Sequence, residues 1–237
     1  MDPLIAIKYI CKGQMKYLGY LSNDDLSFFL KASKFVKVGS PKYLFAQEIA
    51  FNIKKEKMIP APEVNFYNPK GPYGYMSNYY GKTEDKNFKL KIDGKDWAST
   101  EHYYQAMKFT GSDNIFNKEY IETIRKAKTA NISRILALQK VGGGYKWRTD
   151  LNPIIKLAND NGVKIRDDWD SVKDDFMRKA LIYKFSQNEK LRLKLLSTGD
   201  QIIAEDSPRD SYWGVGKNKD GKNMLGILLM ETRQKIV

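Results

Sequence analysis

Seven stretches between residue 99 and the C-terminus have the length and apolar spacing of α-helices. Ser99, a favoured N-cap residue, precedes the first of them. In the last stretch, Leu225, Leu228 and Leu229 lie on one side. Helices of this kind bury one face against another element, so they predict a mainly helical domain. The expected helices cover residues 99–109, 114–126, 129–140, 152–161, 169–186, 189–197 and 223–236.

Three shorter stretches are typical of β-strands, namely residues 64–67, 88–92 and 201–205. Strands this few and short cannot form a large sheet. The expected fold class is therefore α+β, a compact and mainly helical domain with a few short strands.

Two prolines, Pro60 and Pro62, mark a boundary because neither can continue a helix. We therefore expect an N-terminal extension or accessory module at residues 1–63, of unassigned role, and the main domain at residues 64–237. Within the extension, residues 4–11 and 15–21 predict two strands around a turn. Helices are expected around residues 26–30 and 41–57.

The chain has 41 Lys and Arg against 28 Asp and Glu, a net charge of +13. This surplus favours a polyanionic partner, either nucleic acid or a phosphorylated small molecule. A general enrichment in lysine gives the same charge, so the charge alone does not choose a function. One Cys and one His exclude a disulfide framework and the usual zinc clusters. We expect no metal and no cofactor, although Mg²⁺ bound by carboxylates is compatible with the composition.

The longest apolar runs are far shorter than the ~20 residues that cross a bilayer. The N-terminus has neither the basic start nor the apolar segment of a secretory signal. We expect a cytoplasmic protein that does not enter a membrane.

The stretch 99–109 has the most unusual polar pattern. Glu101, Tyr104, Gln105 and Lys108 share one helix face, and such groups are costly to bury unless they bind a ligand or each other. The alternative is an exposed polar face, with Tyr103 and its apolar neighbours on the core side.

A second concentration of polar and aromatic residues covers residues 205–226. An acidic turn comes first, followed by Tyr212 and Trp213, a glycine-rich loop with Lys217, Lys219 and Lys222, and the start of a helix. Backbone amides and lysines before a helix suit a phosphate or pyrophosphate, and the rings suit a stacked base. The alternative is a surface loop with a tryptophan in the core.

Two further segments are candidates for the wall of a pocket. Trp169 begins a helix after Asp167 and Asp168, where the ordinary interpretation is a capping aspartate and a core tryptophan. Tyr67 and Asn78 belong to a strand and an aromatic loop that suit a planar ligand.

Taken in order, these segments resemble the NADAR superfamily, also called YbiA-like. The resemblance covers about residue 65 to the C-terminus. It depends on the Glu-His-Tyr-Tyr-Gln-Ala block that starts at Glu101, on Trp169-Asp170-Ser171-Val172-Lys173, on Tyr212-Trp213-Gly214, and on Gly221-Lys222-Asn223.

The resemblance implies a hydrolase of N-glycosidic bonds, with ADP-ribose as the associated ligand. It places the catalytic carboxylate at Glu101, with Asp210 as its partner. The implied substrate-binding residues are Tyr67, Asn78, Tyr104, Lys108, Trp169, Tyr212, Trp213, Gly214, Lys222 and Asn223.

Three functions are compatible with this resemblance. Some members of the superfamily are antitoxin-like and remove ADP-ribose from guanine bases of nucleic acid, and the positive charge of this chain favours that substrate. Shorter bacterial members cleave phosphorylated intermediates of riboflavin synthesis. The third is a binding module for ADP-ribose without catalysis. Residues 1–63 and an apparent insertion at residues 142–162 distinguish the chain from the short members.

Cleavage of a ribosyl C–N bond passes through an oxocarbenium-like state that a carboxylate stabilises. We therefore expect Glu101 to act as the general base or as the electrostatic stabiliser, and Asp210 to position the ribose hydroxyls or assist proton transfer. Attack by Lys108 or Lys222 on an opened ribose, giving a Schiff base, is a less favoured route.

Overall fold

The computed structural model describes residues 5–11, 14–21, 63–139 and 148–236. The chain divides into two compact units, one with residues 1–63 and 218–220 and the other with residues 64–217 and 221–237. The helices expected around residues 26–30 and 41–57 lie outside the described residues, as do residues 142–147 at the start of the apparent insertion.

In the first unit, β1 (Ile5–Cys11) pairs with β2 (Gln14–Leu21) as an antiparallel hairpin. The register shifts between Ile7 and Lys8, as at a β-bulge. The two strands predicted here are confirmed.

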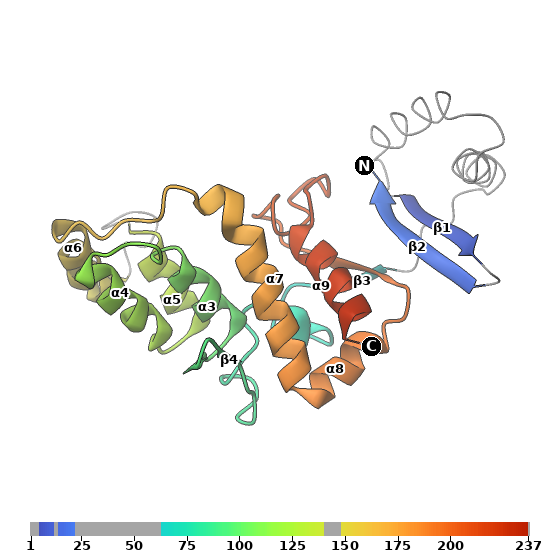
Figure 1. Ribbon diagram of the computed structural model, residues 1–237, viewed down its shortest axis with the longest axis horizontal. Coiled ribbons are helices and arrows are strands. Elements are labelled where there is room, and N and C mark those ends of the chain that lie inside the picture. The colour runs from blue at the N-terminus through green and yellow to red at the C-terminus, as the bar shows by residue number, and fades with distance from the viewer. Residues whose placement is uncertain (1–4, 12–13, 22–62, 140–147, 237) are drawn as a thin grey trace. The chain divides into compact units, whose positions relative to one another are not determined.

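The second unit is built mainly from helices, which confirms the α+β fold class (Figure 1). Its helices are α3 (Thr100–Met107), α4 (Ile115–Arg125), α5 (Ala130–Ala137), α6 (Asn152–Asp160), α7 (Trp169–Gln187), α8 (Glu189–Leu196) and α9 (Met224–Lys235), with short 3₁₀ turns η1 (Gly74–Met76) and η2 (Thr149–Leu151). All seven helices expected in this region are present, with bounds that differ by a few residues.

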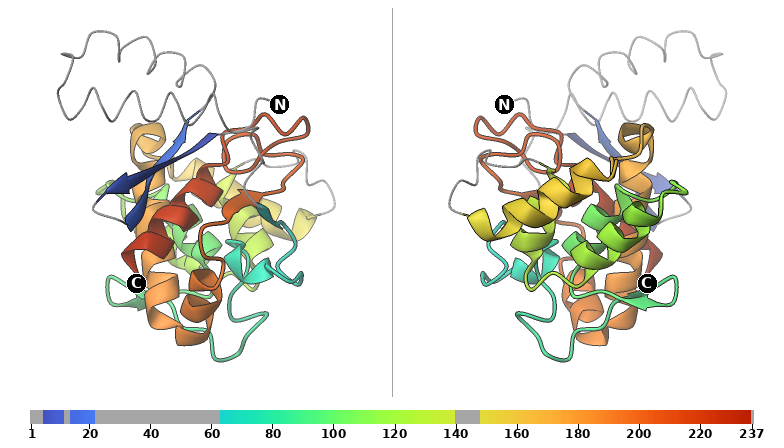
Figure 2. Two further views of the ribbon diagram at one scale, coloured as in Figure 1. Left: turned by 90° about the vertical axis from the view of Figure 1, so that its right-hand side faces the viewer. Right: turned by 90° about the vertical axis from the view of Figure 1, so that its left-hand side faces the viewer.

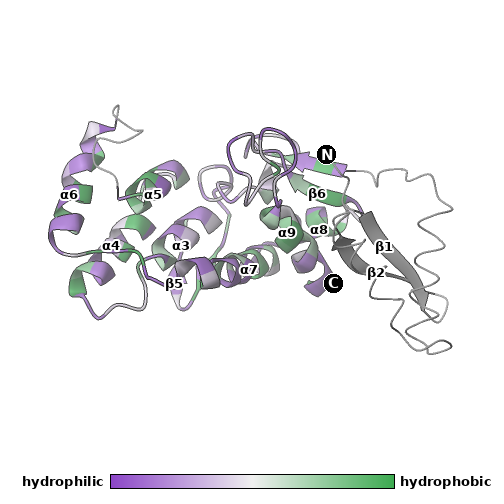
Figure 3. Cartoon of the chain, turned by 90° about the horizontal axis from the view of Figure 1, so that it is seen from above, coloured by the Kyte–Doolittle hydropathy of each residue, from purple (hydrophilic) through white to green (hydrophobic). Residues whose placement is uncertain are grey.

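The long helix α7 is the centre of this unit. It packs against α3 on one side and against α8 and α9 on the other. Hydrophobic and hydrophilic residues occupy different faces of α4 (Figure 3). The buried face of α7 carries Met177, Ala180, Leu181 and Phe185.

The strands are short and form two small sheets in this unit. β3 (Glu63–Phe66) pairs with β6 (Ile202–Glu205), and β4 (Lys91–Ile92) pairs with β5 (Lys95–Asp96). A long irregular loop, orange-red in Figure 2, connects β6 to α9.

The strand predicted over residues 88–92 is mostly wrong, because only its last two residues are a strand. The backbone amides of Lys89 and Lys91 donate to the side-chain oxygens of Asn188 and Gln187 at the end of α7. Side-chain amides therefore replace a neighbouring strand, and the ladder cannot extend.

Gly226, in the first turn of α9, allows this helix to lie directly on β6. A Cβ at this position would meet the carbonyl oxygen of Ile203 at 2.1 Å, which no side chain can tolerate. The loop that precedes α9 is thereby fixed against the end of β6.

Candidate active site

The polar face of α3 is buried. Glu101, Tyr104 and Gln105 each expose 6% or less of their surface. The alternative of an exposed polar face is therefore wrong, because α5 and α7 pack against α3. Ser99 caps the helix as predicted, and its side chain also pairs with His102.

His102 is a structural residue. Its Nδ1 lies 2.8 Å from Ser99 Oγ and its Nε2 lies 3.0 Å from the carbonyl oxygen of Ala127. Burial lowers the pKa of His102, so the neutral ring donates through Nε2 and accepts through Nδ1.

Glu101 is a buried carboxyl with two close polar neighbours. Gln105 Nε2 donates to Glu101 Oε1 at 2.8 Å, and the backbone amide of Glu101 donates to the carbonyl oxygen of Asn78 at 3.0 Å. Burial raises the pKa of Glu101, while the hydrogen bond from Gln105 and the charge of Lys108 act in the opposite direction. A buried carboxyl beside a ligand is a candidate for proton transfer.

Two more acids lie close enough to interact with Glu101. Burial raises the pKa of Glu205, the last residue of β6, to about 8, and the negative charges of Asp210 and Glu101 add to the effect. Glu205 therefore keeps its proton at neutral pH. It was not among the predicted site residues, although the acidic turn at residues 205–206 signalled it.

Asp210 shapes the loop after β6. Its Oδ1 accepts from the backbone amides of Tyr212 at 2.9 Å and Trp213 at 2.8 Å. Gly214 follows, and a Cβ there would meet the carbonyl oxygens of Glu205 and Asp210 at 2.7 and 3.0 Å. The loop is thus folded tightly around the acids.

Five aromatic rings form a continuous run beside these acids. The centroid distances are 5.9 Å from Phe176 to Trp169, 5.0 Å from Trp169 to Tyr104, 5.3 Å from Tyr104 to Trp213, and 5.2 Å from Trp213 to Tyr212. Trp169 is only half-buried, so its interpretation as a core residue is wrong. Asp168 stands at the N-cap of α7, but its side chain pairs with Arg166 instead of capping the helix.

Lysines lie at two places along the ring run. Lys108 Nζ is 5.7 Å from the centroid of Tyr104 and 5.9 Å from that of Trp169. Burial lowers the pKa of Lys108, and the charge of Glu101 opposes the change. Lys173 and Lys222 lie 4.1 and 5.1 Å from the ring of Tyr212.

The Tyr212 ring itself is held by its hydroxyl, which donates to Asp174 at 2.9 Å. Lys173 and Asp174 were not singled out as site residues. Both stand in the first turns of α7, where Lys173 is the last residue of the Trp169 block and Asp174 follows it.

The structure brings together most of the predicted site residues, and two of them differ from the others in their contacts or exposure. Asn223 accepts from the backbone amide of Glu205 and donates to the carbonyl oxygen of Ile203, both at 2.9 Å. Its amide therefore ties the loop to β6. Tyr67 follows β3 and exposes 52% of its surface.

A family model described as the NADAR domain matches residues 65–237. The chain belongs to the NADAR family. This confirms the resemblance inferred from the Glu101, Trp169 and Trp213 blocks.

Relatives in this family carry two kinds of name. The chain is 34% identical to N-glycosidase YbiA of Escherichia coli (strain K12), over 73% of the chain and 88% of that protein. It is 36% identical to N-glycosidase Npun_R5314 of Nostoc punctiforme, over 73% and 92%. It is 32% identical to the riboflavin biosynthesis protein PYRR, chloroplastic, of Zea mays, over 73% of the chain and 25% of that protein.

The fold is also found in a solved structure. The NMR structure of the E. coli protein YbiA matches with a TM-score of 0.55 and 32% identity, over 76% of this chain and 87% of that one.

Lys184 is an unusual buried residue that sequence reasoning gave no role. Its side chain is fully buried in α7, and its Nζ donates to the carbonyl oxygen of Ser77 at 2.8 Å. Burial lowers the pKa of Lys184 to about 7. Its signal in the sequence was a lysine seven residues after Met177, on the apolar face of a helix.

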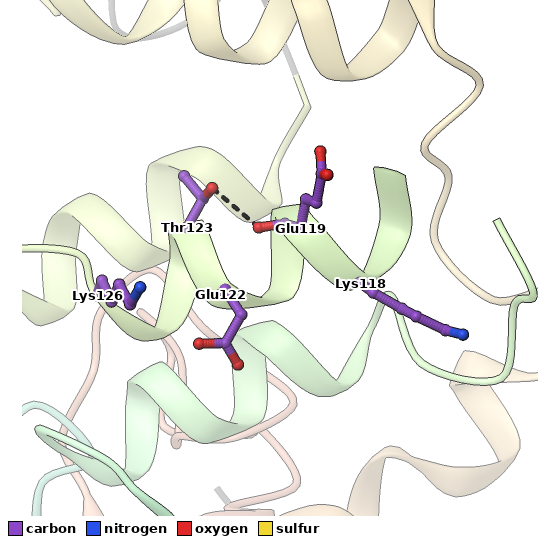
Figure 4. Close-up of a pocket in the computed structure, with 5 residues that line it drawn as sticks. All are labelled: Lys118, Glu119, Glu122, Thr123 and Lys126. Carbon is purple, nitrogen blue, oxygen red and sulfur yellow. Dashed lines mark hydrogen bonds between the residues drawn. The ribbon is translucent and has the colours of Figure 1, made fainter. Parts of the chain in front are cut away.

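A hollow on α4 lies apart from this cluster (Figure 4). One of its two acids, Glu122, is paired with Arg125 and Lys95, whose hydrogen bonds lower the pKa of Glu122 to about 2. The remaining lining residues are Lys118, Glu119, Thr123 and Lys126.

Within the described ranges, no group of three or more His, Cys, Asp or Glu is placed to hold a metal ion. Across the same ranges, no helix has the length and hydropathy needed to span a bilayer.

Proposed function

We propose that this chain is an N-glycosidase that hydrolyses the bond between ribose C1 and a nitrogen atom, releasing ADP-ribose from guanine bases of nucleic acid. The observation that carries the proposal is the buried Glu101 carboxyl, held by Gln105 beside two further acids and the run of rings. The names of the YbiA relatives support the N-glycosidase reaction.

The chemistry requires a group that stabilises positive charge on the sugar and activates water. Glu101 suits this role because burial strengthens its electrostatic effect and raises its pKa, which makes it a stronger base. In this proposal, ionised Glu101 faces the anomeric carbon and takes a proton from the attacking water.

The departing nitrogen requires a proton. Glu205 holds one at neutral pH, whereas Asp210 uses one carboxyl oxygen to order the loop. We therefore assign proton donation to Glu205, and to Asp210 the placement of the loop and of the ribose hydroxyls. Carboxyls whose environments differ in this way commonly divide the acid and base roles.

The ring run and its lysines support a substrate larger than a ribosyl monophosphate. Trp169 is partly accessible and offers a stacking surface for a base. Lys108 stands near one part of the run, and Lys173 and Lys222 near Tyr212, so phosphates have partners at both places. The net charge of +13 supports nucleic acid as the carrier.

A second candidate substrate is a phosphorylated intermediate of riboflavin synthesis. The relatives named riboflavin biosynthesis proteins, from maize and from Vibrio vulnificus, favour it. A direct comparison of the two substrates decides between them. Faster turnover of the free small molecule would refute nucleic acid as the substrate but would leave the proposed N-glycosidase reaction in place.

The test of the reaction is Glu101→Gln, which keeps the shape of the side chain and removes the base. We expect at least about a hundredfold loss of product release, since general acid–base catalysis typically contributes 10²–10⁴. Glu119→Gln, on the exposed surface of α4, is the matched control. Full activity of Glu101→Gln would remove Glu101 from the chemistry, and binding of ADP-ribose without turnover of either substrate would favour a binding module.

A further inference from the structure

Gln105 has two polar ends in its amide, and only one of them has a partner. Its Nε2 donates to Glu101 at 2.8 Å, whereas its Oε1 is buried and unpartnered in the part of the chain that the structure describes. The orientation of the amide follows from chemistry, because an ionised carboxylate only accepts and Nε2 is the donor. A buried acceptor left without a partner costs about 1–3 kcal/mol, so its retention requires an explanation.

The unpartnered oxygen lies near the carboxyl of Glu101. Both ends of the amide belong to one planar group, so Gln105 Oε1 lies within about 5 Å of the Glu101 oxygen that Nε2 contacts. Among the described residues, Oδ1 of Asn78 is a second buried oxygen without a partner, and the backbone carbonyl of the same residue accepts from the backbone amide of Glu101. The backbone of Asn78 is therefore held against the first turn of α3, the turn that carries Glu101.

The chemistry of this set selects its ligand. Carbonyl oxygens and an ionised carboxylate accept hydrogen bonds and donate none, so a suitable ligand must bring several donors. Neighbouring hydroxyl groups of a sugar meet this requirement, and a phosphate does not.

We propose that Gln105 is a substrate-binding residue whose Oε1, together with Asn78 Oδ1, accepts hydrogen bonds from the hydroxyl groups of a ribose, while its Nε2 holds Glu101 in place. The proposal rests on the function given above, since it places the ribose beside Glu101. It adds a specificity: ligands that carry a terminal ribose, one that is not joined to adenine, bind better than the same ligands without that ribose.

The binding test uses calorimetry with two pairs of probes, ADP-ribose against ADP and ribose 5-phosphate against inorganic phosphate. Gln105→Met keeps the volume and removes both polar ends. Gln234→Met, on the exposed side of α9, is the matched control.

We expect the wild type and Gln234→Met to prefer the member with the terminal ribose, in at least one pair, by about tenfold or more, in line with one or two hydrogen bonds. Gln105→Met should lose most of this preference, while its affinity for ADP or phosphate changes less than about twofold. An unchanged preference in Gln105→Met would overturn the proposal, and so would a wild type that does not distinguish the probes. A variant that had merely unfolded would lose both members of a pair, and circular dichroism identifies it.

A second readout needs no substrate. The hydrogen bond from Gln105 lowers the pKa of Glu101, so Gln105→Met should move the titration of the Glu101 carboxyl to higher pH. Carbon NMR of labelled glutamate measures it, with Glu101→Gln to assign the signal. An unchanged titration would overturn the positioning role.

Neither readout depends on hydrolysis, so the two proposals can fail separately. A ribose preference that Gln105→Met loses, without turnover by the wild type, would remove the hydrolase and keep the role of Gln105. Turnover by the wild type, together with a ribose preference that is unchanged in Gln105→Met, would keep the hydrolase and remove the role of Gln105.

Discussion

Replacing Glu205 by Gln should make the protein more stable above pH 8 and leave it almost unchanged near pH 5. Burial and the charges of Asp210 and Glu101 raise the pKa of Glu205 from 4.5 to about 8. Between these two values the folded protein holds a proton that the unfolded chain releases. Stability therefore falls as pH rises from about 4.5 to 8, and the full cost is present above pH 8.

The size of the effect follows from the two pKa values. One pH unit corresponds to 1.36 kcal/mol, so the difference between 4.5 and about 8 sets an upper limit of about 5 kcal/mol. Glu205 is not fully buried, and real protein sites have a higher effective dielectric than a dry interior. We expect about 2 kcal/mol, which for a chain of this length raises Tm by about 4–8 °C.

The assay is thermal unfolding of the wild type, Glu205→Gln and the control Glu119→Gln at pH 5, 6.5 and 8.5. Glutamine has the shape of glutamate and carries no charge, so the gain should grow with pH. The same difference at pH 5 and pH 8.5 would refute the reasoning, as would a Glu205→Gln variant less stable than the wild type at pH 8.5. If Glu205 donates the proton to the departing nitrogen, the same variant also loses about a hundredfold or more in turnover.

Three other changes test separate parts of the structure. Lys184→Met should be stabilising mainly below pH 7, because the cost of the buried ammonium is fully present there and disappears as pH rises toward 10.5. Urea unfolding at pH 6 and 9 measures the difference in free energy of unfolding between variant and wild type, and a difference that grows with pH would contradict the buried charge. Gly226→Ala should destabilise the protein by about 1–3 kcal/mol in urea unfolding, because the new Cβ would overlap the carbonyl of Ile203. Alanine ordinarily favours helices, so a neutral or stabilising result would show that α9 lies further from β6. Lys222→Gln should raise KM for an ADP-ribosylated substrate several-fold and reduce its salt dependence, and an unchanged salt slope would show that Lys222 makes no phosphate contact.

The helices could be predicted because their periodicity and caps are local properties. Ser99 and the spacing of Glu101, Tyr104 and Gln105 defined α3 and its polar face. Whether that face is buried depends on packing partners distant in the sequence, and the sequence pattern left the two possibilities open. The strand at residues 88–92 was misjudged for a similar reason, since Asn188 and Gln187 supply the partners that a strand would need.

The composition of the site was only partly predictable. The motif blocks identified Glu101, Trp169, Tyr212 and Trp213, which the structure brings into one cluster. The proton held by Glu205 could not be predicted, because it results from burial together with two other charges.

The side-chain amides of Gln105 and Asn223 have different roles in the structure. Gln105 appeared in the predicted polar stripe without a role, and its unpartnered oxygen is visible only in three dimensions. Asn223 matched a pocket position, but its hydrogen bonds hold β6.

The buried ammonium of Lys184 also offers a way to time local motion near the site. An acylating reagent can reach its Nζ only after α7 separates from the segment that contains Ser77. The rate of labelling relative to an exposed lysine such as Lys118 then measures how often this opening occurs, with each tenfold of protection equal to about 1.4 kcal/mol. Because Asn78 follows Ser77 and its carbonyl accepts from the backbone amide of Glu101, the same free energy reports how firmly this segment is held beside the first turn of α3.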